Sequence, residues 1–253
     1  MTKPLAKLLG LLIAVFSIMV WADDGFILQV VTEEFPPYNY TENNNITGLS
    51  TEVVSAVLAE AKIKATFRSY PWVRAYKMAL TKPNVLIYSI GRNKKREELF
   101  KWVGVIAPAK FYLFTLKQRD DIQINKLEEA KQYLIGTFRE SVREQYLLSK
   151  GFKKNVNILS YYDYKRGLTM LINKRIDLWA MNEMVAYHIC KSMGYKPEKL
   201  LRQAYFFADL SPEGYYMALN KDTSDELVNK LRESLSILSD KGVLQKIHQN
   251  YSK

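Results

Sequence analysis

Apolar and polar positions in the first half of the chain follow two alternating periods, one typical of strands and one typical of helices. The run "NVLIYSI" (84–90) consists mostly of β-branched and large apolar residues, as a buried parallel strand does. In another segment, Val54, Val57, Leu58 and Ala61 recur at helical spacing. The pattern predicts strands at 27–32, 65–70 and 84–90, with helices between them at 49–63 and 72–80.

The second half repeats this order of elements without repeating the sequence. Ser141 and Glu144 form an S-x-x-E capping box, and Asp163 is the expected cap of the next helix. Each half is therefore a βαβαβ unit, which indicates an α/β lobe with a parallel sheet flanked by helices. The second unit has predicted strands at 133–138, 156–161 and 176–181, and predicted helices at 141–150 and 163–174.

Two extended apolar runs, 108–117 and 211–221, connect the halves. Beyond them, Thr223 and Glu226 form a second capping box before a final leucine-striped helix. Two crossings between two lobes predict a hinged α/β protein with a cleft. We expect lobe I at 23–115, lobe II at 116–210, and a return to lobe I with C-terminal helices at 211–253.

The N-terminus has the pattern of a secretory signal peptide. Lys3 and Lys7 precede an apolar run from Leu8 to Val20, and Ala22 ends a plausible cleavage site. The run is short for a bilayer span of about 20 residues, so an uncleaved anchor is the weaker alternative. Residues 1–22 contain two lysines and no acidic residue, so cleavage lowers the formal net charge from +11 to +9.

The basic charge does not point to nucleic acid, because the lysines are scattered and form no basic arm. A solvated basic surface is the simpler interpretation. Cys190 is the only cysteine, and the two histidines, His188 and His248, lack the spacing of metal ligands. We expect neither a metal nor another cofactor.

Polar and aromatic residues follow the predicted strands at the end where α/β sheets bind ligands. These segments are "VTEEFPPY" (31–38), "SYPW" (69–72), "YSIGR" (88–92), "TFRES" (137–141) and "AMNE" (180–183). The charged run "GRNKKREELF" (91–100) begins just past a strand end, at the expected mouth of the cleft. A solvated turn is the alternative for that run.

The order and spacing of these segments resemble the bacterial extracellular solute-binding proteins of family 3, the periplasmic receptors for polar amino acids that serve ABC transporters. The resemblance extends from about Leu28 to Tyr251. It rests on "EEFPPYNY" with "ITGLSTEVV", "YPWVRA", "IYSIGRNKKREELFKWVGVI", "RIDLWAMNE" and "LSDKGVLQKIHQNY". It implies a monomeric periplasmic protein that closes on a small solute with a carboxylate and delivers it to a membrane ABC permease.

The resemblance also implies roles for individual residues. Arg96 matches the arginine that clamps the ligand α-carboxylate, a role that suits the two-pronged guanidinium. A surface ion pair with Glu97 or Glu98 is its alternative. The other implied wall residues are Ser89 and Gly91 near the carboxylate, Phe35 as the stacking aromatic with Tyr38 beside it, Trp72 opposite, and Phe138 and Ser141 from lobe II.

One position departs from the family pattern. Asn182 stands where these receptors usually have the aspartate that accepts the ligand ammonium. Glu33 matches a second acidic position near the ammonium, whereas Glu183 is expected to point away. Four more arginines, Arg74, Arg92, Arg139 and Arg143, add positive charge around the cleft or belong to solvated faces.

Two other functions compete with solute binding. An enzyme on the same scaffold, similar to the periplasmic cyclohexadienyl dehydratases, needs a placed acid or base, and Glu33 and Glu183 are the obvious candidates. A sensing module that signals to a membrane partner without transport has the same sequence features as a transport receptor.

We predict that the exported protein begins at Asp23, because cleavage of a V-x-A site falls after Ala22. N-terminal sequencing of the protein from a periplasmic extract checks this. A protein that stays in the membrane with Met1 intact would show the uncleaved anchor instead.

Overall fold

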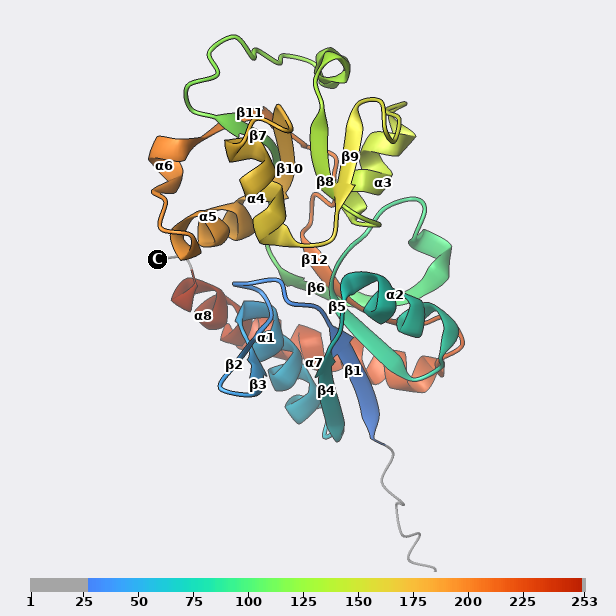
Figure 1. Cartoon of the computed structure of the whole chain (residues 1–253). Helices are drawn as coiled ribbons and strands as arrows, with labels where there is room; N and C mark the ends of the chain where they lie inside the picture. The colour runs from blue at the N-terminus through green and yellow to red at the C-terminus, as the bar shows by residue number, and fades with distance from the viewer. Residues whose placement is uncertain (1–26, 252–253) are drawn as a thin grey trace, which may run out of the picture.

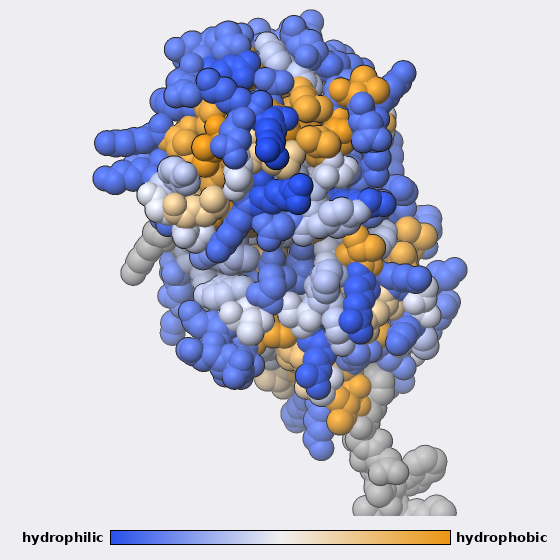
Figure 2. All heavy atoms as spheres, in the orientation of Figure 1, coloured by the Kyte–Doolittle hydropathy of each residue, from blue (hydrophilic) through white to orange (hydrophobic). Residues whose placement is uncertain are grey.

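A computed structural model of the chain describes residues 27–251, so the predicted signal peptide lies outside the described residues. Two five-stranded sheets, each flanked by helices, form two lobes that lie one above the other in Figure 1. Hydrophilic side chains cover most of the face in Figure 2, and the apolar positions form separate patches. No helix within 27–251 is long and apolar enough to cross a membrane.

The sheet of lobe I has the order β4-β1-β5-β12-β6. β1 pairs in parallel with β4 and β5, whereas β12 runs antiparallel to both β5 and β6. All seven residues of β5 are buried, which suits the central strand of a sheet covered on both faces. The strands are β1 (Leu28–Thr32), β4 (Ala65–Ser69), β5 (Val85–Gly91), β6 (Phe100–Ala107) and β12 (Tyr215–Asn220).

Helices from both ends of the chain cover this sheet. Gly104 of β6 lets the last long helix approach, since a Cβ on it would lie 2.5 Å from Cδ2 of Leu235. The C-terminal segment therefore packs against the sheet of lobe I. The elements are α1 (Leu49–Glu60), α2 (Trp72–Thr81), α7 (Asp225–Asp240), α8 (Val243–Asn250), the 3-10 helix η1 (Glu97–Leu99) and the hairpin β2 (Tyr40–Glu42) and β3 (Asn45–Thr47).

The sheet of lobe II has the order β11-β7-β10-β8-β9. β8 pairs in parallel with β9 and β10, and β7 runs antiparallel to β10 and β11. Its strands are β7 (Phe111–Leu116), β8 (Ile135–Phe138), β9 (Ile158–Tyr161), β10 (Leu178–Asn182) and β11 (Leu201–Phe206). Its helices are η2 (Leu127–Gln132), α3 (Val142–Ser149), α4 (Tyr164–Ile172), α5 (Glu183–Ser192) and α6 (Pro197–Leu200).

Both βαβαβ units are present, so the predicted two-lobed α/β fold is confirmed. The sheets are mixed, however, because the extended segments on either side of the crossings join them as antiparallel strands. The first crossing is 108–110, within the extended run 108–117, and the rest of that run forms β7, which pairs within the second sheet. The second crossing is 207–214.

Two of the predicted helix caps are confirmed and one is wrong. Ser141 accepts from the Glu144 backbone N–H, and Asp163 accepts from that of Arg166. The Thr223 hydroxyl instead accepts from the backbone N–H of Asn84, and Ser224 caps α7. The sequence offered two adjacent hydroxyls, and a contact with a distant loop selected between them.

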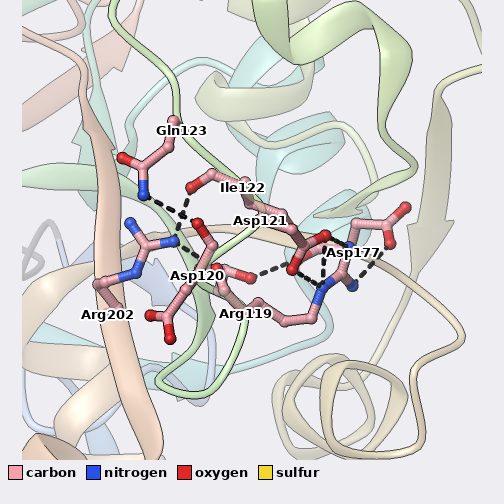
Figure 3. Close-up of polar contacts among 8 residues, drawn as sticks. Arg119, Asp120, Asp121, Ile122, Gln123, Asp177 and Arg202 are labelled. Carbon is pink, nitrogen blue, oxygen red and sulfur yellow. Dashed lines mark hydrogen bonds and ion pairs between the residues drawn. The ribbon is translucent and has the colours of Figure 1, made fainter.

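Two arginines fix the loop that follows β7 (Figure 3). Arg119 donates to Asp177 at 3.0 Å and to Asp121 at 2.8 Å. Arg202, which projects from β11, donates to the backbone carbonyls of Arg119 and Ile122 at 2.7 and 2.6 Å. These contacts attach the loop to the end of lobe II, through two ion pairs of Arg119 and two backbone carbonyls that accept from Arg202.

We expect Gly167→Ala to destabilise the protein, although alanine in an exposed helix interior gains about 1 kcal/mol over glycine. A Cβ at Gly167 would lie 2.6 Å from both Nε1 of Trp179 and Cζ of Tyr161, and Nε1 of Trp179 donates to the Tyr161 hydroxyl. Overpacking of this kind costs about 1–3 kcal/mol. Urea unfolding measures the loss, and exposed Lys165→Ala on the same helix is the control. A stabilised Gly167→Ala protein would contradict the packing described here.

Candidate functional site

A small cavity lies between the lobes, at the carboxyl ends of β1 and β5 and at the start of α3. Its volume is about 20 Å³, room for about one water molecule. Both lobes contribute to its wall, and Tyr215 lies directly after the second crossing. The lining residues are Glu33, Phe35, Trp72, Ser89, Gly91, Arg96, Ser141, Val142, Arg143, Tyr164 and Tyr215.

Aromatic rings form one side of this cavity. Phe35 stacks on Tyr38 with ring centroids 5.5 Å apart, and the edge of Tyr215 meets both rings at 5.5 and 4.9 Å. Phe111 packs against the other side of Tyr215 at 5.6 Å. Phe35 and Tyr38 lie in the loop after β1, Tyr215 begins β12 and Phe111 begins β7, so this cluster joins the two lobes beside their connection.

The loop after β1 is held against the end of β5 by Asn39. Its amide donates to the Glu33 carbonyl at 2.6 Å, and its side-chain oxygen accepts from Ser89. Ser89 adopts a φ of 56°, in the left-handed region. The sequence suggested that Ser89 and Gly91 end a strand beside a ligand, and the structure places both on the cavity wall.

Gly91 allows the lobes to touch. A Cβ at this position would lie 2.7 Å from Cγ1 of Val142, the first residue of α3. Real Cβ atoms essentially never approach another atom so closely. A side chain at residue 91 therefore requires the lobes or the Val142 side chain to move.

Arg96 is fully buried at the same contact. Its guanidinium donates to the Gly91 carbonyl at 3.0 Å, to Oε1 of Gln145 at 3.0 Å and to the Glu140 carbonyl at 2.9 Å. It lies over the rings of Trp72 and Tyr76, at 5.3 and 5.0 Å. Burial lowers the pKa of Arg96 to about 10, so it remains protonated at neutral pH.

The ion pair in the charged run belongs to other residues. Arg92 pairs with Glu97, and both side chains are more than one-third exposed. The alternative of a surface pair for Arg96 is therefore wrong. The run 91–100 contains both a solvated turn and one buried guanidinium directed into the cleft.

Glu140 links the lobes through its backbone. Its carbonyl accepts from Nε1 of Trp72 at 3.0 Å as well as from Arg96. The backbone of Glu140 has a φ of 58°, an unusual conformation for a residue other than glycine. Such backbone conformations persist where surrounding contacts determine them.

Glu33 faces lobe II from the end of β1. The Tyr164 hydroxyl donates toward its carboxyl, 3.2 Å from each oxygen. Burial raises the pKa of the Glu33 carboxyl to about 8, although Arg143 and the Tyr164 hydrogen bond act in the opposite direction. The carboxyl is therefore mostly protonated at neutral pH.

Seven of the ten predicted site residues line the cavity, whereas Tyr38, Phe138 and Asn182 do not. The Tyr38 hydroxyl donates to the Pro108 carbonyl at 2.8 Å, at the first crossing. Phe138 lies behind Tyr164, stacked at 4.1 Å. The Asn182 side chain caps α5 by accepting from the Val185 N–H at 3.2 Å. What the seven wall residues do with a ligand stays a prediction.

Sequence reasoning missed Val142, Tyr164 and Tyr215 as wall residues, and it left Arg143 open between the cleft and a solvated face. Tyr164 follows Asp163, the predicted cap of α4, and lies only three residues after the end of β9. That position near a strand end was the signal that could have identified it. Tyr215 lies in an extended segment where every side chain looked equally apolar. Arg143 is 2% exposed and lines the cavity.

A larger open groove, about 1020 Å³, lies on the outer side of the charged run. Mixed charges line it, among them Lys94, Lys95, Lys150, Asp209 and Glu213. Within the described part of the chain, no three His, Cys, Asp or Glu side chains are arranged to hold a metal ion. The interlobe cavity, by contrast, is lined by the buried charged residues Glu33, Arg96 and Arg143, so it is the candidate site.

Comparison with known proteins identifies the family. The model of the bacterial extracellular solute-binding proteins, family 3, matches residues 28–253. The chain belongs to this family. The chain is similar to the arginine-binding periplasmic protein of Mannheimia haemolytica, 24% identical over 250 residues, which are 95% of this chain and 97% of that protein. The probable amino-acid-binding protein YxeM of Bacillus subtilis (strain 168) is 22% identical over 230 residues, 90% of this chain and 84% of that protein.

A solved structure confirms the fold of this family 3 protein. A histidine kinase sensor domain with similarity to periplasmic binding proteins superposes with a TM-score of 0.79. The superposition covers 91% of this chain and 97% of that domain, at 18% sequence identity. At that identity the likeness shows the fold alone.

We predict that Glu33 makes the ligand-free protein less stable as the pH rises. The folded protein holds the Glu33 proton up to about pH 8, while the unfolded chain releases it near pH 4.5. Between these values the folded state binds more protons, so the free energy of unfolding falls as the pH rises through this range. Thermal unfolding at about pH 5 to pH 9 measures this, and Glu33→Gln should flatten the profile.

The neighbouring Glu34→Gln is the control with the opposite sign. Partial burial acts to raise the pKa of the Glu34 carboxyl, but hydrogen bonds from Ser69 and Thr41 lower this pKa overall. This replacement should therefore destabilise the protein at neutral pH. Parallel profiles for wild type and Glu33→Gln would contradict a buried, protonated Glu33.

Proposed function

We propose that this protein captures a small polar solute with a carboxylate between its lobes and delivers it to an ABC transporter. The observation that carries the proposal is Arg96, a buried guanidinium that bonds both lobes at the cavity wall. Family membership supports solute binding. The named relatives bind amino acids, so an amino acid or a related carboxylate is the proposed ligand class.

The crossings have the arrangement that a hinge needs. Gly214 of the second crossing lies against the start of the first, since a Cβ on it would be 2.2 Å from the carbonyl oxygen of Ala107 and 3.3 Å from Cα of Pro108. Its φ of 126° favours glycine. Two adjacent connections can bend together while each sheet stays intact.

Opening of the lobes is part of the proposal, because the cavity is far smaller than a solute site. Such sites measure about 300–1,000 Å³, against about 20 Å³ here. A solute enters when the lobes separate, because Arg143 and Tyr164 of lobe II then move away from lobe I and enlarge the cavity. Closure returns Trp72 and Arg96 to the Glu140 carbonyl.

The cavity favours binding over catalysis. Glu33 is the one carboxyl on its wall, and Glu183 points away to hydrogen-bond Gln203. Burial raises the pKa of the Tyr164 hydroxyl well above its usual value, so it supplies no base at neutral pH. An acid–base pair for an enzyme is therefore lacking among the cavity residues that the structure describes.

The proposed location is the periplasm, as a monomer after removal of the signal peptide, and the proposed partner is a membrane permease. A sensing role would use the same closure with a different membrane partner. Co-purification of the exported protein with a permease or with a kinase separates these two roles.

A ligand screen tests the proposed function. The exported protein is heated with single amino acids and small organic acids, and small-angle scattering then follows the best ligand. A ligand at about 100 times its Kd stabilises the folded state by about 2.7 kcal/mol. No stabilisation by any small solute would reject the proposal.

We predict that Arg96→Lys weakens binding of the best ligand from this screen by about tenfold or more. Lysine keeps the charge but loses the two-pronged fork, and charged hydrogen bonds contribute about 1.5–3 kcal/mol. The ligand-free variant should also unfold more easily, because three buried hydrogen bonds are disturbed.

Titration calorimetry measures the three Kd values of Arg96→Lys, Arg92→Lys and Lys94→Ala. Arg92 and Lys94 lie on the exposed side of the run, so their replacement should change Kd little. Equal small effects at all three positions would remove Arg96 from the binding site.

A further inference from the structure

Arg143 is a buried charge that the protein itself leaves incompletely paired. It is the second residue of α3, is 2% exposed and lines the interlobe cavity. Its guanidinium lies 5.9 Å from the ring centroids of Phe35 and Phe111. Its Nε is buried and has no hydrogen-bond partner in the described chain. Burial of an incompletely paired charge costs stability, so an anionic group bound beside Arg143 would be stabilising.

The position of Arg143 adds to this cost. A helix N-terminus carries a partial positive charge, and arginine in the first turn of α3 faces it unfavourably. Arg96 lines the same cavity and is close enough for Arg143 to contribute to its lowered pKa. Two guanidinium ions and a helix N-terminus therefore share one small space.

Acidic side chains of the protein do not balance these charges. Glu33 faces both arginines, and burial keeps its pKa near 8. The carboxylates of Glu140 and Glu144 are near Lys154, at 3.8 and 3.1 Å. At neutral pH the cavity thus has an excess of positive charge.

We propose that the solute of this cleft is a small dicarboxylate, with one carboxylate paired to Arg96 and the other to Arg143. This inference rests on the proposed function and adds the charge of the ligand to it. Each guanidinium can hold one carboxylate by charge-assisted hydrogen bonds. Two anionic groups would neutralise the excess charge when the lobes meet.

The same charges argue against a cationic solute. An arginine ligand would bring its own guanidinium next to two others, and like charges repel strongly where water is excluded. Asn182 stands at the family position for the ammonium acceptor, but it caps α5 away from the cavity wall. The arginine specificity of the Mannheimia haemolytica relative therefore does not suit this cleft.

Dicarboxylates with and without an amino group share the proposed chemistry. An amino group near Glu33 would draw that carboxyl into its ionised form. Glu33→Gln should then weaken the binding of L-glutamate, whereas the affinity for glutarate should stay the same or increase. If the natural solute lacks an amino group, wild type should bind glutarate or succinate at least as tightly as L-glutamate or L-aspartate.

Calorimetric titration of the exported protein with L-glutamate, L-aspartate, glutarate, succinate, L-glutamine and L-arginine tests the inference. At least one dicarboxylate should bind about tenfold or more tightly than L-glutamine, with L-arginine weakest. Arg143→Met should reduce that preference about tenfold or more, and Arg143→Lys should recover part of it.

Two controls separate charge recognition from damage to the fold. Arg139→Met removes an exposed arginine that contacts Tyr162, and it should leave the preference intact. Ligand-free Arg143→Met should unfold at the same temperature as wild type or higher, because it removes an incompletely paired buried charge.

The inference is overturned if L-glutamine or L-arginine binds more tightly than every dicarboxylate, or if no dicarboxylate binds folded wild type. An unchanged preference in folded Arg143→Met overturns it too. In each case, binding of any other solute that depends on Arg96 would leave the proposed function standing.

Discussion

The arrangement of this protein depends on the burial of one guanidinium at the junction of two lobes. Arg96 has no exposed surface, so its donors need acceptors inside the protein. One acceptor belongs to lobe I, at Gly91, and two belong to lobe II, at Glu140 and Gln145. The hydrogen bonds of a single side chain thus require the lobes to approach, and Gly91 leaves Val142 room to do so.

The electrostatics of the cavity follow from this contact. Water is nearly excluded, so charges interact strongly there and a carboxyl tends to keep its proton. Glu33 is protonated at neutral pH for that reason, and it cannot cancel the charge of Arg96 and Arg143. Although the family and the named relatives point to amino acids, the charge of this cleft is a property of its own residues.

The antiparallel strands β7 and β12 explain how the two separate sheets are connected to each other. β12 enters the first sheet directly after the second crossing, and β7 enters the second sheet directly after the first. Each crossing is therefore attached at both ends to a hydrogen-bonded strand. The aromatic cluster around Tyr215 lies at the same junction, so the connection between the lobes is packed rather than loose.

The sequence by itself determined the two βαβαβ units and the cap at Asp163, because hydrophobic period and cap chemistry are local properties, and its resemblance to family 3 pointed to most of the cavity wall. Tertiary structure decided the rest. Alternation cannot tell which strand lies beside another, so β12 and β7 looked like linkers. Nor can it tell whether a strand-end side chain turns into a cavity or behind it, which separates Tyr164 from Phe138. Whether an arginine ends in water or in a cleft depends on the lobe opposite, and only packing placed Arg143 inside.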